Sequence, residues 1–225
     1  MNIPQGEIVL LGSSGHAAVI ADIVAREGRW HLSGVLDPER PRGSMWNGLE
    51  ILGGDGDIGA LMASRGIVGG IVAIGDNALR ERVTRRIAAE CPQFQFVTAV
   101  HPAAAVASSV SIGAGSVVMA GAVVNPGSTV GCGCIVNTRS SLDHDSVMED
   151  FASLAPGATT GGRVRIGRGS AIGLGALLRE AVVVAESTVV GAGALVLSDL
   201  PSSVVAYGVP ARVIRSRKPG DKYMR

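Results

Sequence analysis

From Val100 to Val196 the chain repeats one pattern of hydrophobic and polar positions with a period of six residues. An aliphatic residue fills sixteen of the seventeen positions in this register, and the exception is Thr160. A small residue or valine follows each of the first sixteen positions four residues later. Neither an amphipathic helix nor a hairpin strand has this period. The pattern predicts a three-sided solenoid in which each hexapeptide forms one face, the aliphatic residue points inward, and three hexapeptides complete a coil.

Up to about Phe96 the pattern is different, because short apolar runs alternate with stretches of helical period. The runs at residues 7–11, 32–36 and 70–74 predict strands, each followed by glycine or aspartate. Asn77 is a candidate cap for a helix that begins after the third run. The residues that share one face of a helix after the first run are Ala17, Ile20, Ile23 and Val24. This alternation predicts a small parallel sheet with flanking helices.

Length and composition agree with two domains. The chain has 225 residues, and domains average about 150. We place an α/β domain at residues 1–98 and the repeat domain at residues 99–225. Only 17% of the residues are charged and 3% are aromatic, so small aliphatic side chains must fill the interior and extensive disorder is excluded.

Charge, cysteine usage and hydropathy exclude several classes of function. A formal net charge of +1 argues against a general nucleic-acid binder, because phosphate-driven affinity needs a concentrated positive field. The three cysteines form no C-x-x-C pair, so neither a disulfide framework nor a zinc site is indicated, and we expect them to be buried small residues. No apolar run is long enough for a membrane span or a secretory signal. We expect a cytoplasmic protein without membrane insertion.

The turn after the first expected strand reads GSSGHA, from Gly12 to Ala17. It precedes a helix, where free backbone amides attract an anion. It departs from the dinucleotide-binding fingerprint because Ser14 stands in place of the second glycine. The turn therefore indicates a phosphate-binding loop of a different kind.

The unbroken hexapeptides, the GSSGHA turn and the closing sequence GVPAR at residues 208–212 carry a family resemblance over essentially the whole chain. Together they resemble the sugar O- and N-acyltransferases that join a small nucleotide-binding-like domain to a left-handed parallel β-helix. The most similar subgroup contains the bacterial nucleotide-sugar N-acetyltransferases of the bacillosamine and perosamine type, with the sialic acid O-acetyltransferases. The resemblance alone implies the left-handed coil, acetyl-CoA as co-substrate without a metal, and a homotrimer with the site between neighbouring subunits.

Acetyl transfer from a thioester needs a base and a donor for the developing oxyanion. Among the four histidines only His144 lies inside the repeat, between Asp143 and Asp145, at a position where side chains leave the coil. In the resembled family this histidine is the general base, and the following acidic residue, here Asp145, raises its basicity. A solvent-exposed histidine in a polar corner is the alternative interpretation. A zinc enzyme on the same repeat would need three histidine ligands, which this repeat does not contain.

Gly162 follows His144 by eighteen residues, so it should lie one coil away from the base. Its missing side chain would let the thioester approach a backbone amide that acts as oxyanion donor. In the resembled enzymes the glycine at this place contacts acetyl-CoA, whereas an ordinary turn glycine is the alternative. Their neighbouring cofactor contact is a histidine, and Ser153 stands there in this chain.

The remaining site residues follow from the resemblance. It places the sugar nucleotide at the GSSGHA turn, with His16 near the sugar and the diphosphate, and Asp37 where it can accept hydrogen bonds from ribose or base. An aspartate before Pro38 also initiates turns, so the role of Asp37 has a structural alternative. Asn137 matches a residue near the acceptor, although asparagine at a coil corner also satisfies backbone groups. The expected substrate contacts are Ser14, Gly15, His16, Asp37, Pro38, Gly53 and Asn137.

The expected activity is acetyl-CoA-dependent N-acetylation of a nucleotide-linked 4-amino-4,6-dideoxy sugar for surface polysaccharide or glycan synthesis. The alternatives are an O-acetyltransferase of the sialic acid type and a non-catalytic trimeric scaffold. The sequence leaves open whether the carrier is UDP or GDP. The basic residues Arg212, Arg215, Arg217 and Lys218 would contact coenzyme A phosphates or form a solvated, partly frayed tail.

Overall fold

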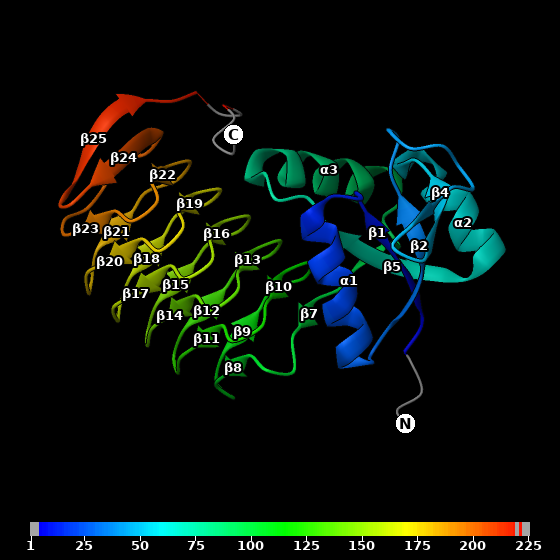
Figure 1. The fold of residues 1–225 in the computed structure, drawn as a ribbon, viewed down its shortest axis with the longest axis horizontal. Helices are drawn as coiled ribbons and strands as arrows, with labels where there is room; N and C mark the ends of the chain where they lie inside the picture. The colour runs from blue at the N-terminus through cyan, green and yellow to red at the C-terminus, as the bar shows by residue number, and fades with distance from the viewer. Residues whose placement is uncertain (1–4, 219–220, 222–225) are drawn as a thin grey trace.

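The computed structural model describes residues 5–218 and 221, and it contains an α/β unit followed by a long stack of short strands (Figure 1). Residues 1–4, on which the expectation of no secretory signal partly rested, lie outside the described residues. Within the described part of the chain, no helix has the length and apolar character that a bilayer crossing requires.

The N-terminal unit is built on one six-stranded sheet with the order β3-β4-β2-β1-β5-β6. All neighbouring strands are parallel except β3 and β4, which are antiparallel. The strands are β1 (Glu7–Leu11), β2 (His31–Leu36), β3 (Met45–Trp46), β4 (Leu49–Gly53), β5 (Ile67–Val72) and β6 (Gln95–Phe96). The helices are α1 (Gly15–Glu27), the short 3₁₀ helix η1 (Asp55–Asp57), α2 (Ile58–Arg65) and α3 (Asn77–Glu90).

The predicted parallel sheet is confirmed, and the face of α1 that was expected to be buried is buried at all four positions. The expected cap of α3 was wrong. Asp76 caps this helix by accepting a hydrogen bond from the amide of Leu79 at 2.9 Å, and Asn77 is the first helical residue and is buried. Asp76 and Asn77 are both good capping residues, so only the backbone path could decide between them.

The second unit is a parallel β-helix, as the period of six predicts. Its seventeen two-residue strands, β7 to β23, fall into three sheets, and each strand pairs with the strand eighteen residues away (Figure 1). The 8-stranded sheet contains β7 (Ala99–Val100), β10 (Val117–Val118), β13 (Ile135–Val136), β16 (Ser153–Leu154), β19 (Ala171–Ile172) and β22 (Val189–Val190). The 6-stranded sheet contains β8 (Ala105–Val106), β11 (Val123–Val124), β14 (Ser141–Leu142), β17 (Thr159–Thr160), β20 (Leu177–Leu178) and β23 (Leu195–Val196). The 5-stranded sheet contains β9 (Ser111–Ile112), β12 (Thr129–Val130), β15 (Val147–Met148), β18 (Arg165–Ile166) and β21 (Val183–Val184).

The second residue of each short strand is the residue of the hydrophobic register, and together these residues form the core of the helix. Each buried aliphatic side chain contributes about 1.5–3 kcal/mol relative to an exposed one. The small residues four positions later are largely buried at the corners, for example Ser116, Ser128, Ser140 and Ser146 at 0% exposure. A larger side chain would not fit where the chain turns so closely, which explains the second row of the sequence pattern.

From residue 115 to residue 193 every turn between consecutive short strands holds a residue with positive φ, and glycine fills many of these positions. Where another residue stands there it adopts the same left-handed conformation, as do Arg139, Asp145, Phe151 and Arg163 with φ between 56° and 58°. This conformation is unfavourable for most residues, although aspartate tolerates it better than most. The turn thus fixes the backbone of Asp145 in a conformation that the repeat imposes.

The N-terminal unit packs on the 8-stranded sheet of the β-helix. The residues of α1 share a core cluster with Ala99, Val117 and Ile135. Arg80 of α3 is 2% exposed, and its guanidinium donates to the carbonyl oxygens of Gly133 at 2.7 Å and Phe151 at 3.1 Å. These contacts fix the α/β unit against one face of the prism.

After β23 the chain forms an antiparallel hairpin of β24 (Val204–Gly208) and β25 (Ala211–Ser216), which extends the 8-stranded sheet. The expectation of a frayed tail was wrong for Arg212, Arg215 and Arg217. The first two lie in β25, and Arg217 is 9% exposed and donates to the carbonyl oxygen of Ser187 at 3.1 Å. The expectation of three buried cysteines was also wrong, because Cys134 is buried while Cys91 is half-buried and Cys132 is exposed.

Candidate active site

His144 lies in the corner between β14 and β15, on the edge of the prism that joins the 6-stranded and 5-stranded sheets. Its Nδ1 lies 2.9 Å from Oδ2 of Asp145, and the side chains of both residues are exposed, at 47% and 62%. A carboxylate accepts hydrogen bonds only, so Nδ1 carries the proton and Nε2 is left as the basic nitrogen of the neutral ring. The predicted base and orienter therefore form the expected pair.

The surroundings raise the pKa of His144 above its ordinary value. The hydrogen bond that His144 donates to Asp145 is the largest cause, and the negative charge of Asp143 adds to it, whereas partial desolvation and the charge of Arg163 act in the opposite direction. Surroundings that stabilise the charged imidazolium make the neutral imidazole a stronger base. The pair can thus accept a proton from an incoming nucleophile and hold it.

Gly162 lies directly against the imidazole, as the spacing of eighteen residues predicts. A Cβ atom at this position would be 2.4 Å from Nε2 and 2.5 Å from Cε1 of His144. Ordinary contacts between carbon atoms are about 3.5–4.0 Å. The glycine therefore makes room for the ring of the base, and its predicted contact with the cofactor stays a prediction.

The expected sugar-nucleotide residues of the N-terminal unit come together at the carboxyl ends of β1, β2 and β4. Ser13 donates to Oδ2 of Asp37 at 2.5 Å, and the backbone amide of Asp37 donates to the carbonyl oxygen of Gly53 at 2.8 Å. Pro38 lies beside Gly54. Asp37 also forms the turn that its alternative interpretation described, because Oδ1 accepts from the amide of Glu39 at 2.9 Å. Ligands of parallel α/β sheets bind at this edge.

Ser14 and Gly15 are exposed at the start of α1, and a Cβ added at Gly15 would meet no atom within 4 Å. Ser14 precedes the helix with an extended backbone, and its side chain forms no capping hydrogen bond. The first amides of a helix have no partner inside it. The start of α1 can therefore receive an anionic group from solution.

His16 follows on the same turn, and its Nε2 is buried without a hydrogen-bond partner in the part of the chain that the structure describes. Burial, and to a lesser extent the charge of Arg80, lower the pKa of His16 to about 4. The ring is therefore neutral near pH 7, and a neutral imidazole can donate or accept one hydrogen bond at Nε2, depending on its tautomer.

Ser153 lies on β16 of the sheet that carries the N-terminal unit, and Asn137 lies in the turn that follows β13 of the same sheet. Oδ1 of Asn137 accepts from the amide of Thr138 at 2.8 Å, the backbone role that its alternative interpretation described. Oγ of Ser153 accepts from Nδ2 of Asn77 at 3.1 Å. Asn77 and Arg80 are buried although they lie on a polar helix, and no sequence pattern indicated that these two residues would contact the β-helix.

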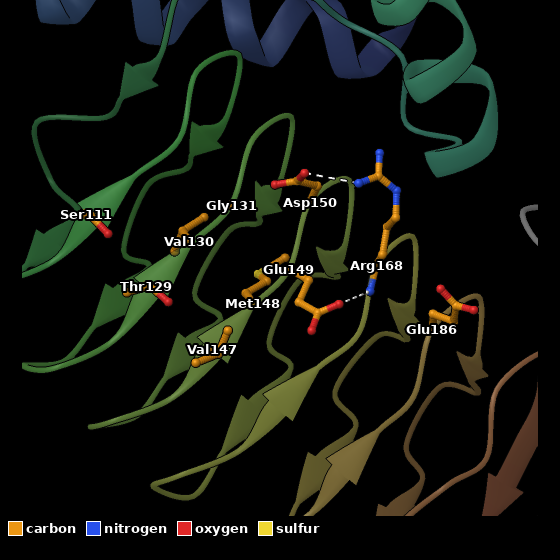
Figure 2. Close-up of a pocket in the computed structure, with 10 residues that line it drawn as sticks. All are labelled: Ser111, Thr129, Val130, Gly131, Val147, Met148, Glu149, Asp150, Arg168 and Glu186. Carbon is orange, nitrogen blue, oxygen red and sulfur yellow. Dashed lines mark hydrogen bonds and ion pairs between the residues drawn. The ribbon is translucent and has the colours of Figure 1, made fainter.

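The hollow in Figure 2 lies over strands β9, β12 and β15 of the 5-stranded sheet and over the turns that follow its strands, and it has a volume of about 440 Å³. Arg168 on its rim is bonded to Asp150 at 3.1 Å and to Glu81 of α3 at 2.7 Å. None of the predicted site residues lines this hollow. Among residues 5–218 and 221, no group of three or more His, Cys, Asp or Glu side chains is placed to hold a metal ion.

Comparison with known proteins shows which family the chain is part of. Residues 7–87 match the family model of the PglD N-terminal domain. A crystal structure of a perosamine N-acetyltransferase mutant from Caulobacter crescentus, in complex with CoA and GDP-perosamine, is 34% identical, covers 96% of this chain and 100% of that chain, and superimposes with a TM-score of 0.88. The chain belongs to the nucleotide-sugar N-acetyltransferase family.

Other members of the family are similar over different lengths. The acetyltransferase domain of PglB from Neisseria gonorrhoeae, in complex with acetyl coenzyme A, is 36% identical, covers 92% of this chain and 98% of that chain, and has a TM-score of 0.85. GDP-perosamine N-acetyltransferase from Escherichia coli O157:H7 is 28% identical over 150 residues, which span 64% of this chain and 66% of that protein. The chain thus spans less than two thirds of the length of the first curated relatives it matches.

Proposed function

We propose that this family member is an acetyl-CoA-dependent N-acetyltransferase that acts on the amino group of a nucleotide-linked 4-amino-4,6-dideoxy sugar, in the synthesis of a surface glycan. The observation that carries the proposal is the exposed pair of His144 and Asp145, whose Nδ1 and Oδ2 atoms are 2.9 Å apart. The pair stands on a β-helix that is joined to a parallel sheet of the kind that binds nucleotides at its carboxyl edge. Similar proteins are named for GDP-perosamine and for UDP-N-acetylbacillosamine, so we assign the class of amino sugar and test both carriers.

In the proposed reaction, the amine nitrogen of the sugar attacks the carbonyl carbon of the thioester. Nε2 of His144 accepts the proton that the nitrogen loses, and Asp145 holds the ring through Nδ1–H. A backbone amide beside Gly162 donates to the oxyanion. The tetrahedral intermediate then collapses, the C–S bond breaks, and the imidazolium returns the proton to the thiolate of coenzyme A.

The sugar nucleotide would bind at the start of α1. The helix amides receive the diphosphate, and Asp37 accepts hydrogen bonds from the nucleoside. His16 has a buried Nε2 that a sugar or phosphate oxygen would supply with its missing partner. The neutral ring avoids the cost of burying a charge.

We further infer that the active assembly is a homotrimer. His144 stands on the edge between the 6-stranded and 5-stranded sheets, whereas the N-terminal unit packs on the 8-stranded sheet, the opposite side of a three-sided prism. A nucleotide bound at the N-terminal unit of one subunit would then meet His144 of another. Light scattering measures the mass of the assembly.

Release of the free thiol from acetyl-CoA tests the activity, with GDP- and UDP-linked 4-amino sugars as acceptors. We expect release that depends on one of these acceptors, and a loss of about a thousandfold in His144→Ala. His31→Ala is the matched control, because His31 is another exposed histidine paired with a carboxylate, at 2.7 Å from Glu7. No acceptor-dependent release from any of these substrates refutes the proposed function.

Mixed subunits test the shared site. His144→Ala chains, which lack the base, and Asp37→Ala chains, which bind the nucleotide more weakly, are denatured together and refolded so that subunits exchange, and the mixture is assayed at a low concentration of sugar nucleotide. If the base and the nucleotide site come from different chains, some sites in the mixture are intact and activity returns. Activity that does not exceed the sum of the two parents, in a mixture shown to contain mixed assemblies, contradicts the shared site.

A further inference from the structure

Thr160 is the one polar residue in the inward-facing row of the β-helix. It is 4% exposed and lies on β17, in the coil next to that of β14. Buried hydroxyl groups cost free energy unless they form a hydrogen bond. The position therefore needs a partner, and the core around it is apolar.

The partner is the backbone amide of Asp143, which donates to Oγ1 of Thr160 at 2.9 Å. In neighbouring coils the amide at this position donates to the backbone carbonyl of the aliphatic residue one coil on. Examples are Asn125 to Leu142 at 3.0 Å and Gly161 to Leu178 at 2.8 Å. The pairing of β14 with β17 accordingly keeps only the residue pair Ser141–Thr159, whereas β11 and β14 pair at two positions.

The altered hydrogen bond lies next to the base. Asp143 immediately precedes His144, and its Oδ1 accepts from the amide of His144 at 2.8 Å and from Nδ2 of Asn125 at 2.6 Å. Thr160 therefore fixes the backbone of Asp143, and Asp143 in turn fixes the backbone of His144. A displacement of this backbone would move the ring relative to Asp145 and Gly162.

We propose that Thr160 is a positioning residue for His144: its buried hydroxyl replaces a backbone carbonyl as the acceptor for Asp143 and thereby sets the backbone from which the imidazole projects. The proposal rests on the proposed role of His144 as the base. It explains why a hydrophobic row that is otherwise unbroken contains a hydroxyl at this one coil.

Two substitutions separate this role from a merely structural one. Thr160→Val fits the aliphatic row and lets the amide of Asp143 donate to a backbone carbonyl, as the equivalent amides of the other coils do, so we expect a melting temperature equal to or above that of the wild type. We expect kcat to fall about tenfold or more, because small displacements of a reacting group are costly, with KM for acetyl-CoA nearly unchanged. Thr160→Ser keeps the hydroxyl and removes a buried methyl group, so the melting temperature should fall while kcat stays within about threefold.

Thr159→Val is the matched control, because Thr159 lies on the same strand with its side chain exposed. The ¹H–¹³C NMR signal of Cε1 in His144, assigned by its loss in His144→Ala, gives a readout that needs no substrate. It should shift in Thr160→Val and remain in place in Thr159→Val.

The outcomes are distinct from those of the proposed function. If the wild type transfers acetyl groups and Thr160→Val matches it in kcat and in the His144 signal, the positioning role is wrong. A fall in kcat of equal size in Thr160→Ser and Thr160→Val also overturns it, because the hydroxyl would then be irrelevant. If the wild type transfers no acetyl group, the proposed function fails, and the NMR comparison alone decides whether Thr160 places the ring.

Discussion

Replacing Gly162 by alanine should disable the base without unfolding the protein. The new Cβ would lie 2.4 Å from Nε2 of His144, whereas an ordinary contact needs about 3.5 Å. The imidazole must therefore move by about 1 Å, and a displacement of this size in a reacting group can cost about a hundredfold in rate. Because the ring is exposed at 47%, it can swing outward, and we expect the free energy of unfolding to change by about 1 kcal/mol or less.

Steady-state kinetics with both substrates varied measure the effect of Gly162→Ala. A fall in kcat with nearly constant KM values indicates a displaced base, whereas a rise in KM for acetyl-CoA alone indicates that the glycine contacts the cofactor. In a His144→Ala background the second substitution should have no further effect on the rate, since the ring it displaces is absent. Gly59→Ala in α2 is the control, because its Cβ would meet nothing closer than 4.0 Å. A kcat for Gly162→Ala within twofold of the wild type refutes the reasoning.

Three further predictions follow from the described contacts. Asp145→Asn removes the main cause of the raised pKa of His144, so this pKa should fall. In a pH profile of kcat/KM from pH 5 to 9, the acidic limb should move to lower pH, and the plateau should drop because the base is weaker. An acidic limb that does not move contradicts this prediction. Asp37→Ala should raise the Kd of the nucleoside diphosphate about tenfold, because a hydrogen bond to a charged group contributes about 1.5–3 kcal/mol. Calorimetry measures this Kd, and unchanged affinity for both GDP and UDP would show that Asp37 is not part of the site. Arg217→Ala should lower the free energy of unfolding, measured in urea, by about 2 kcal/mol. The reason is that the Arg217 side chain donates to the carbonyl oxygen of Ser187 at 3.1 Å. A higher KM for acetyl-CoA at unchanged stability would instead support a contact between Arg217 and coenzyme A.

The β-helix could be predicted almost residue by residue because its rule is local and repeated. One aliphatic residue in six fixes the strand, the face and the register together, and all seventeen positions of the register lie in strands. The C-terminal hairpin escaped prediction because β24 and β25 do not follow this period. The segments β3, β4 and α2 escaped because they are short and only weakly patterned.

The candidate site was predicted in part, and the difference lies in which contacts are local. His144 and Asp145 are neighbours in sequence, and Gly162 follows at the coil spacing, so arithmetic places all three. The contacts of Arg80 with Gly133 and Phe151 join α3 to distant turns, and no sequence spacing indicates them. Thr160 was visible as the exception in the row, but its meaning depends on which oxygen accepts the amide of Asp143.

The pairing of each strand with the strand eighteen residues away limits how this protein could change its length during evolution. Inserting or deleting one whole coil between the N-terminal unit and His144 would keep the base on the same edge and shift it along the axis by about 4.8 Å, the distance between neighbouring strands. A change of six residues would instead carry it about a third of a turn around the axis to another edge. Reshaped loops could therefore accommodate substrates of different size, whereas the position of His144 along the axis of the β-helix can change only in steps of one coil.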